Sequence, residues 1–191
     1  KWSAATDDRS GIGGYILALN KWTPGFDNWL VAPITSWSIT QTLTDGSYTL
    51  AIASLDQAGN VNPADTNQQG DAPYYQFTVD TVLPTSTVMS LGAVQSTILF
   101  TVTWSGQDDV AGVARYDIQF KDGNGPWLNW LVGTEKTSAT FHGTNGHSYA
   151  FRSQAHDAAG NIETSHVQAD TTTNVTVSST PPTAIHDLTL L

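Results

Sequence analysis

The feature of this chain that most limits its fold is an internal duplication. Residues 2–15 read WSAATDDRSGIGGY, and residues 104–116 read WSGQDDVAGVARY. Two further motifs recur at an offset of 101 residues: DQAGN at 56 returns as DAAGN at 157, and NWL at 28 returns at 129. A repeat of about 100 residues is too long for a solenoid unit and has the length of a whole domain. The 191 residues therefore predict two small domains in tandem.

The second repeat has the alternation of a sheet that is buried on one face. In residues 97–104, one side of the strand is formed by Ile98, Phe100, Val102 and Trp104, and the other by Leu99, Thr101 and Thr103. Seven short strands in about 100 residues are typical of an antiparallel β-sandwich. We expect these strands at 85–91, 97–104, 113–121, 127–132, 138–142, 148–157 and 168–177.

The first repeat predicts the same sandwich without its opening strand. Strands are expected at 14–20, 47–56 and 75–80, and only the end of a second strand remains at 1–3. An open sheet edge is unfavourable. From the two repeats, we divide the chain into domains at 1–81 and 82–179. Residues 180–191 are a linker and a strand, which either opens a following unit or completes the first domain, in the same chain or by strand exchange with a neighbouring chain.

Charge and composition exclude several classes of function. The net charge is −10, and the seven Lys and Arg residues are scattered, whereas binding to nucleic acid requires clustered cations. The chain has no cysteine, which excludes disulfides and thiolate metal sites. It also has no apolar run of transmembrane length, so we expect no membrane insertion.

Several motifs together resemble bacterial fibronectin type III and immunoglobulin-like repeats. The Trp-Ser pairs, the Asp-x-Ala-Gly-Asn motifs, and the Val-Asp-Thr-x-x-Pro linker at 79–84 carry the resemblance, which covers nearly the whole chain. Tyr48 and Tyr149, each preceded by a Gly and a Ser, are similar to the tyrosine corner of such sandwiches. The resemblance implies a β-sandwich fold. It also implies a place in a large secreted or cell-surface protein, beside proteases, glycosidases or adhesive domains.

The acidic motifs are candidate calcium ligands. In the expected topology, the Asp-Asp pairs follow the second strand and the Asp-x-x-x-Asn motifs follow the last but one, so both lie at the same end of each domain. Oxygen ligands without Cys or His suit calcium. The alternative is that each Asp accepts backbone hydrogen bonds within its own turn and that no cofactor is bound. The candidates are Asp7, Asp8, Asp56, Asn60, Asp108, Asp109, Asp157 and Asn161.

Three tryptophans are candidate ligand-binding residues. Trp127 and Trp130 are three positions apart in an expected strand, so they should point to opposite faces, with one exposed or at a sheet edge. Trp29 repeats Trp130 in the first domain. An exposed indole can stack on a sugar or anchor a protein partner, and the alternative is that these rings cover the sandwich edge. The histidines are expected to be solvated surface residues.

No catalytic motif is apparent. Adjacent Asp residues in a turn do not fix the carboxylate separation of a glycosidase, and no Gly-x-Ser-x-Gly elbow occurs. We therefore expect a non-catalytic spacer and interaction module of a larger extracellular or cell-surface protein, with the neighbouring domains of that protein as partners. The alternative is a binding module for polysaccharide or a surface protein, which uses exposed Trp residues and is stabilised by calcium.

Overall fold

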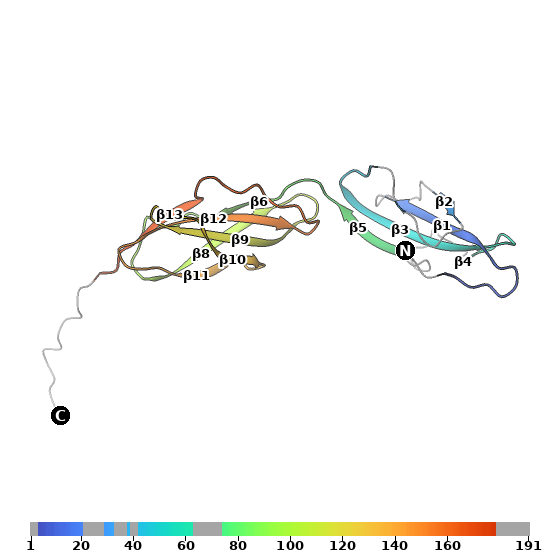
Figure 1. The fold of residues 1–191 in the computed structure, drawn as a ribbon, viewed down its shortest axis with the longest axis horizontal. Helices are drawn as coiled ribbons and strands as arrows, with labels where there is room; N and C mark the ends of the chain where they lie inside the picture. The colour runs from blue at the N-terminus through green and yellow to red at the C-terminus, as the bar shows by residue number, and fades with distance from the viewer. Residues whose placement is uncertain (1–3, 21–28, 33–37, 39–41, 63–73, 179–191) are drawn as a thin grey trace, which may run out of the picture. The chain divides into compact units, whose positions relative to one another are not determined.

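The computed structural model describes residues 4–20, 29–32, 38, 42–62 and 74–178. The chain divides into two compact units, Lys1–Val82 and Leu83–Leu191. All regular structure in the described ranges is β-strand, which confirms the all-β fold class (Figure 1). None of the described residues form a helix of the length and hydropathy that a membrane span needs. Residues 1–3, to which we assigned the end of a strand, and residues 180–191, to which we assigned a linker and a strand, lie outside the described residues.

Within its described residues, the first unit contains one five-stranded antiparallel sheet. Its strands run in the order β2-β1-β3-β4, and β5 pairs with the other part of the same edge of β3. The strands are β1 (Ile12–Asn20), β2 (Trp29–Ala32), β3 (Gly46–Asp56), β4 (Val61–Asn62) and β5 (Tyr74–Val79).

Alternation in β1 explains which face of this sheet is buried. Tyr15, Leu17 and Leu19 lie two residues apart and are buried. Leu17 and Leu19 are paired with Ile52 and Leu50 of β3, which are half-buried on the same face. Since cross-strand neighbours share a face, these side chains form a continuous apolar surface over the two central strands.

The second unit is a sandwich of two sheets. A five-stranded sheet has the order β10-β9-β12-β13-β7, and a three-stranded sheet has the order β11-β8-β6 (Figure 1). All pairs are antiparallel except β13 with β7. The strands are β6 (Thr85–Val88), β7 (Val94–Gln95), β8 (Leu99–Gln107), β9 (Val113–Asp122), β10 (Leu128–Thr134), β11 (Ser138–His142), β12 (Ser148–Asp157) and β13 (Thr171–Val175).

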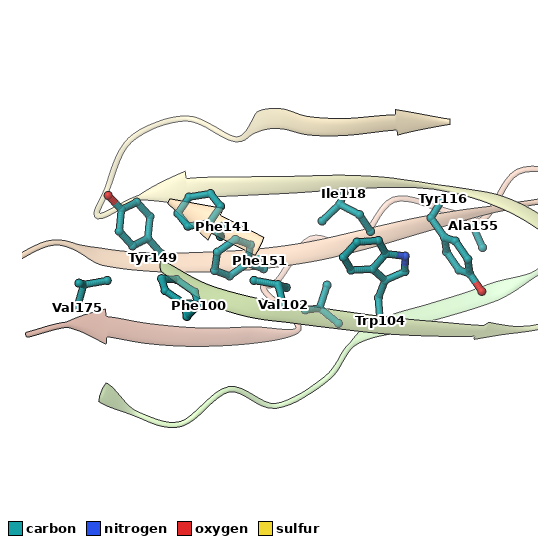
Figure 2. Close-up of a cluster of buried hydrophobic side chains, with 11 residues drawn as sticks. Phe100, Val102, Trp104, Tyr116, Ile118, Phe141, Tyr149, Phe151, Ala155 and Val175 are labelled. Atoms are coloured by element: carbon teal, nitrogen blue, oxygen red, sulfur yellow. The ribbon is translucent and has the colours of Figure 1, made fainter. Parts of the chain in front are cut away.

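An aromatic core fills the space between the two sheets of the second unit (Figure 2). Phe151 is fully buried, and its ring lies 4.9 Å from that of Phe141 in an edge-on arrangement. Phe141 also contacts Phe100 at 5.5 Å and Tyr149 at 5.0 Å. Edge-on aromatic pairs contribute about 0.5–1.5 kcal/mol each beyond the burial of their area. Of the expected inward positions in 97–104, Phe100, Val102 and Trp104 therefore form part of the core.

Both expected tyrosine corners are present. The hydroxyl of Tyr48 donates to the carbonyl oxygen of Thr44 at 2.7 Å. The hydroxyl of Tyr149 accepts the N–H of Thr144 at 3.0 Å. Each bond fixes the loop before a central strand to that strand, as in sandwiches that resemble fibronectin type III domains.

Some details of the second unit differ from the expectation. Ile98 is exposed, because β8 begins only at Leu99. The opening strand β6 ends at Val88 rather than at residue 91, because Leu91 donates its N–H to the hydroxyl of Thr171. The two-residue strand β7 was not expected.

Candidate ion-binding and ligand-binding sites

The acidic turns of the second unit lie at one end of its sandwich. Asp108 follows β8, and Asp157 ends β12. A carboxylate oxygen of Asp108 lies within 4.8 Å of one of Asp157. The topology therefore brings these two candidates together, whereas Asp109 is exposed.

Asp157 caps its own turn through a buried carboxylate. It is 2 % exposed and accepts hydrogen bonds from Gly160 N at 2.7 Å, Asn161 N at 2.8 Å and Asn161 Nδ2 at 2.7 Å. Burial raises the pKa of Asp157, but the hydrogen bonds from Asn161 and Gly160 together lower it by more. The net pKa of Asp157 therefore lies below its ordinary value. Asn161 thus presents its amide nitrogen, rather than its oxygen, to Asp157.

The first unit makes the same bonds at the equivalent positions. Asp56 accepts Asn60 N and Asn60 Nδ2, both at 2.7 Å. Asp7 accepts Gly11 N at 2.6 Å, as Asp108 accepts Gly112 N at 2.7 Å. These hydrogen bonds lower the pKa of Asp7, chiefly through Gly11, and that of Asp56, chiefly through Asn60. The acidic motifs of both repeats therefore accept hydrogen bonds within their own turns. Asp8 is exposed and takes part in none of the bonds described.

One carboxylate oxygen in the second unit has an environment suited to a cation. Oδ1 of Asp108 is buried, and among the described residues no donor reaches it. A buried oxygen without a donor is unfavourable unless an ion or water satisfies it. Together with the nearby carboxylate of Asp157, it provides two hard oxygen ligands of the kind that calcium prefers.

Trp130 and Trp127 lie in different environments. Trp130 packs edge-on against Trp104 at 6.2 Å and against Phe141 at 5.2 Å, so it belongs to the core. Trp127 is half-buried, with the guanidinium of Arg152 at 4.3 Å from its ring centroid and Lys121 Nζ at 5.4 Å. Cations in these positions are attracted to the ring. Trp29 lies in β2, and its side chain is outside what the structure describes.

A shallow groove of about 580 Å³ borders this aromatic–cation cluster. Its lining combines small, hydroxyl and amide side chains from β12 and β13, namely Ser148, Ala150, Thr172 and Asn174, with Lys121 from β9. Lys121 thus belongs both to the groove and to the cluster around Trp127. Such a lining offers hydrogen bonds rather than an apolar surface.

The cluster around Trp127 occurs in the second repeat only. At the offset of 101 residues, the first repeat has Asn20, Phe26 and Ala51 in place of Lys121, Trp127 and Arg152. The two cations are thus particular to the second unit, although an aromatic residue is kept.

The expectation that the histidines are solvated is wrong for His156, which lies on β12. It holds for His142 and His147, which are exposed, and His166 is half-buried. His156 is buried, and its Nε2 lies 3.1 Å from Asp117 Oδ2. His147 Nδ1 lies 2.7 Å from Asp122 Oδ2, and His166 contacts two carboxylates. The acidic partner of His156, Asp117, lies on β9, so the local pattern around His156 could not predict this contact.

The chain is similar to a known enzyme over most of its length. Chitinase A1 of Niallia circulans is 34 % identical over 164 residues. The alignment takes in 84 % of this chain and 21 % of the chitinase, so the chain spans about a fifth of the length of this curated relative. No family model matches the chain.

Proposed function

We propose that this chain is a non-catalytic spacer and interaction module of a larger extracellular protein that degrades polysaccharide. The observation that carries the proposal is the match of two tandem β units to about a fifth of a chitinase. Chitin is an insoluble polymer, so an enzyme that degrades it meets its substrate outside the cell. Domains that position a catalytic domain on such a solid need a packed core and no active site of their own.

The acidic groups support a structural role. A general acid of a glycosidase needs a raised pKa, whereas the pKa of Asp157 is lowered. Both of its carboxylate oxygens accept hydrogen bonds from its own turn. We therefore assign this carboxylate to the shape of the loop rather than to turnover.

A chimera tests the spacer role. The matching region of the Niallia circulans chitinase is replaced by this chain, or by a Gly/Ser linker of equal extended length. We expect the first chimera to retain hydrolysis of insoluble chitin, and we expect the second to lose part of it, because a flexible linker does not hold domains apart. Hydrolysis of a soluble chitin oligomer serves as the control and should be equal in both. Equal activity of both chimeras on insoluble chitin would contradict the spacer role.

A second candidate function is polysaccharide binding by the groove and Trp127. The groove supplies hydroxyl and amide groups, and the half-buried indole of Trp127 beside it supplies an aromatic ring of the kind that stacks on sugars. Lys121 and Arg152 flank the indole and would repel a cationic polymer there, whereas Asp170 in the groove lining offsets part of this repulsion. The indole side of the site therefore fits chitin better than its deacetylated, cationic form.

Co-sedimentation of the chain with insoluble chitin tests this candidate. We expect binding to chitin, weaker binding to chitosan, and loss of binding in Trp127→Ala. Val132→Ala is the matched control, since Val132 is exposed on β10 and contributes nothing to the groove. Equal retention of Trp127→Ala and the control would remove the candidate.

We also propose that calcium binds at Asp108 and Asp157. Two observations support this site: Oδ1 of Asp108 is buried without a donor among the described residues, and a carboxylate oxygen of Asp108 lies within 4.8 Å of one of Asp157. An ion that binds only the folded state stabilises it by about 2.7 kcal/mol at a hundred times its Kd. Thermal melts in excess calcium and in chelator should therefore differ, and Asp108→Asn should abolish the difference. Superimposable melts of the unaltered chain would exclude the site.

A further inference from the structure

Two carboxylates join β6 to the opposite sheet of the second unit. Glu163 Oε1 accepts the N–H of Ser86 at 2.7 Å, and its Oε2 accepts the N–H of Ala155 at 2.8 Å. Asp170 Oδ2 accepts the N–H of Val88 at 2.8 Å and the N–H of Ser153 at 3.0 Å. Each carboxylate therefore bonds one backbone group of β6 and one of β12.

These bonds take the place of a neighbouring strand at the edge of the three-stranded sheet. β6 pairs with β8 on one side. On the other side, the N–H groups of Ser86 and Val88 donate to the two side chains rather than to a strand. An edge strand with unpaired backbone groups is a site of unwanted pairing, so the carboxylates protect this edge as well as bridging the sheets.

His166 lies between the two carboxylates. Its Nδ1 is 2.5 Å from Asp170 Oδ1, and its Nε2 is 3.0 Å from Glu163 Oε1. A neutral imidazole carries one N–H, so only the doubly protonated imidazolium can donate to both carboxylates at once. The loss of one proton would place a ring lone pair against a carboxylate oxygen and remove the positive charge between two anions.

Of the charged groups around His166, the carboxylates of Glu163 and Asp170 favour the imidazolium, whereas the cationic Arg152 opposes it. β6 contributes hydroxyl and amide donors and no charged group, and β12 contributes Arg152, whose Nη1 donates to the carbonyl oxygen of His166. Partial burial lowers the pKa of His166, but the contacts with Asp170 and Glu163 raise it, and the net pKa lies above its ordinary value. A group with a raised folded-state pKa stabilises the fold below its unfolded pKa, and that stability is lost as the pH rises through the folded pKa.

We propose that His166 is a proton-operated clamp, which holds Glu163 and Asp170 against β6 when protonated and releases β6 from β12 when it loses a proton. The clamp would loosen the entry strand of the second unit under alkaline conditions while the aromatic core stays packed. Glu163, His166 and Asp170 all lie on one loop between β12 and β13. The single proton on His166 therefore controls the four backbone hydrogen bonds that the two carboxylates accept.

Hydrogen exchange measured by NMR on the whole chain tests this clamp. Protection factors, corrected for the intrinsic pH dependence of exchange, are followed for Ser86 and Val88 from about pH 6 to about pH 9. We expect their protection to fall as the pH rises, by up to about tenfold for each unit by which the folded pKa exceeds the unfolded one. Protection of Phe151 in the core should change less.

Two variants separate the clamp from general effects of pH. His166→Gln should have low, pH-independent protection at Ser86 and Val88. His142→Gln, which alters an exposed histidine on β11, should behave like the unaltered chain. Identical pH profiles for His166→Gln and the unaltered chain would overturn the proposal. If His166→Gln does not fold, the ring of His166 is titrated in the unaltered chain, and titration at or below about pH 6.5 would overturn it equally.

Discussion

Replacing Asp157 by alanine should destabilise the second unit through the loss of one turn. The change removes the acceptor of three hydrogen bonds, from Gly160 N and from both nitrogens of Asn161. A hydrogen bond contributes about 0.5–1.5 kcal/mol net, and more when the acceptor is charged. Residues 158–160 are exposed, so water can reach the freed donors and the lower values apply. The expected loss is about 2 kcal/mol in total, which for a unit of about 100 residues corresponds to about 8–16 °C in Tm.

The first unit supplies a matched control for this change. Asp56→Ala removes the same pair of bonds from Asn60, but its carboxylate is not buried, so a smaller loss confined to the first unit is expected. Hydrogen-exchange mass spectrometry in a urea series reads the units separately, through peptides of β3 and of β12. A second-unit midpoint that Asp157→Ala leaves unchanged would refute the reasoning, because the turn would then be held by other contacts.

Three further predictions concern the stability of the second unit. Tyr149→Phe removes the acceptor of the Thr144 N–H and should cost about 1 kcal/mol in urea unfolding; an unaltered midpoint would show that water replaces the hydroxyl. Phe151→Ala empties a fully buried site and should cost about 3–5 kcal/mol, and a loss below about 1 kcal/mol would mean that the core collapses around it. The lowered pKa of Asp157 gives stability that is present above the unfolded pKa of about 3.9 and lost as the pH falls through the folded pKa. Melts between about pH 5 and about pH 2 should therefore show an acid-dependent loss that Asp157→Asn lacks, and equal slopes for both proteins would contradict this assignment.

The strands of the second unit were predictable where alternation and turns agree. β11 and β12 have the expected bounds, because polar turns flank both segments and every second residue of β12 from Tyr149 to Ala155 is buried. β7 was not predictable. Val94 and Gln95 are too few to show a period, and their parallel partners Asn174 and Val175 lie some eighty residues further on.

The candidate sites also differ in how far the sequence predicts them. Because β8 and β12 end at the same pole of the sandwich, topology alone brings Asp108 and Asp157 close together. The clamp formed by Glu163, His166 and Asp170 gave no such signal. Glu163 replaces Asn62 of the first repeat, so the duplication does not mark it, and its partner Ser86 lies 77 positions away. Pairings between a loop and a distant edge strand depend on packing that no local pattern contains.

The places where the chain enters and leaves the second unit have a mechanical consequence. The chain enters the unit at β6, where Thr85 pairs with Gln107 at the end of β8. It leaves after β13, where Val175 donates its N–H to the carbonyl oxygen of His147, just before the start of β12 (Figure 1). Tension between neighbouring domains would therefore pull along the strands. Hydrogen bonds between strands run across that direction, so they share the load in shear instead of opening one after another. A unit connected in this way resists stretching between its two ends.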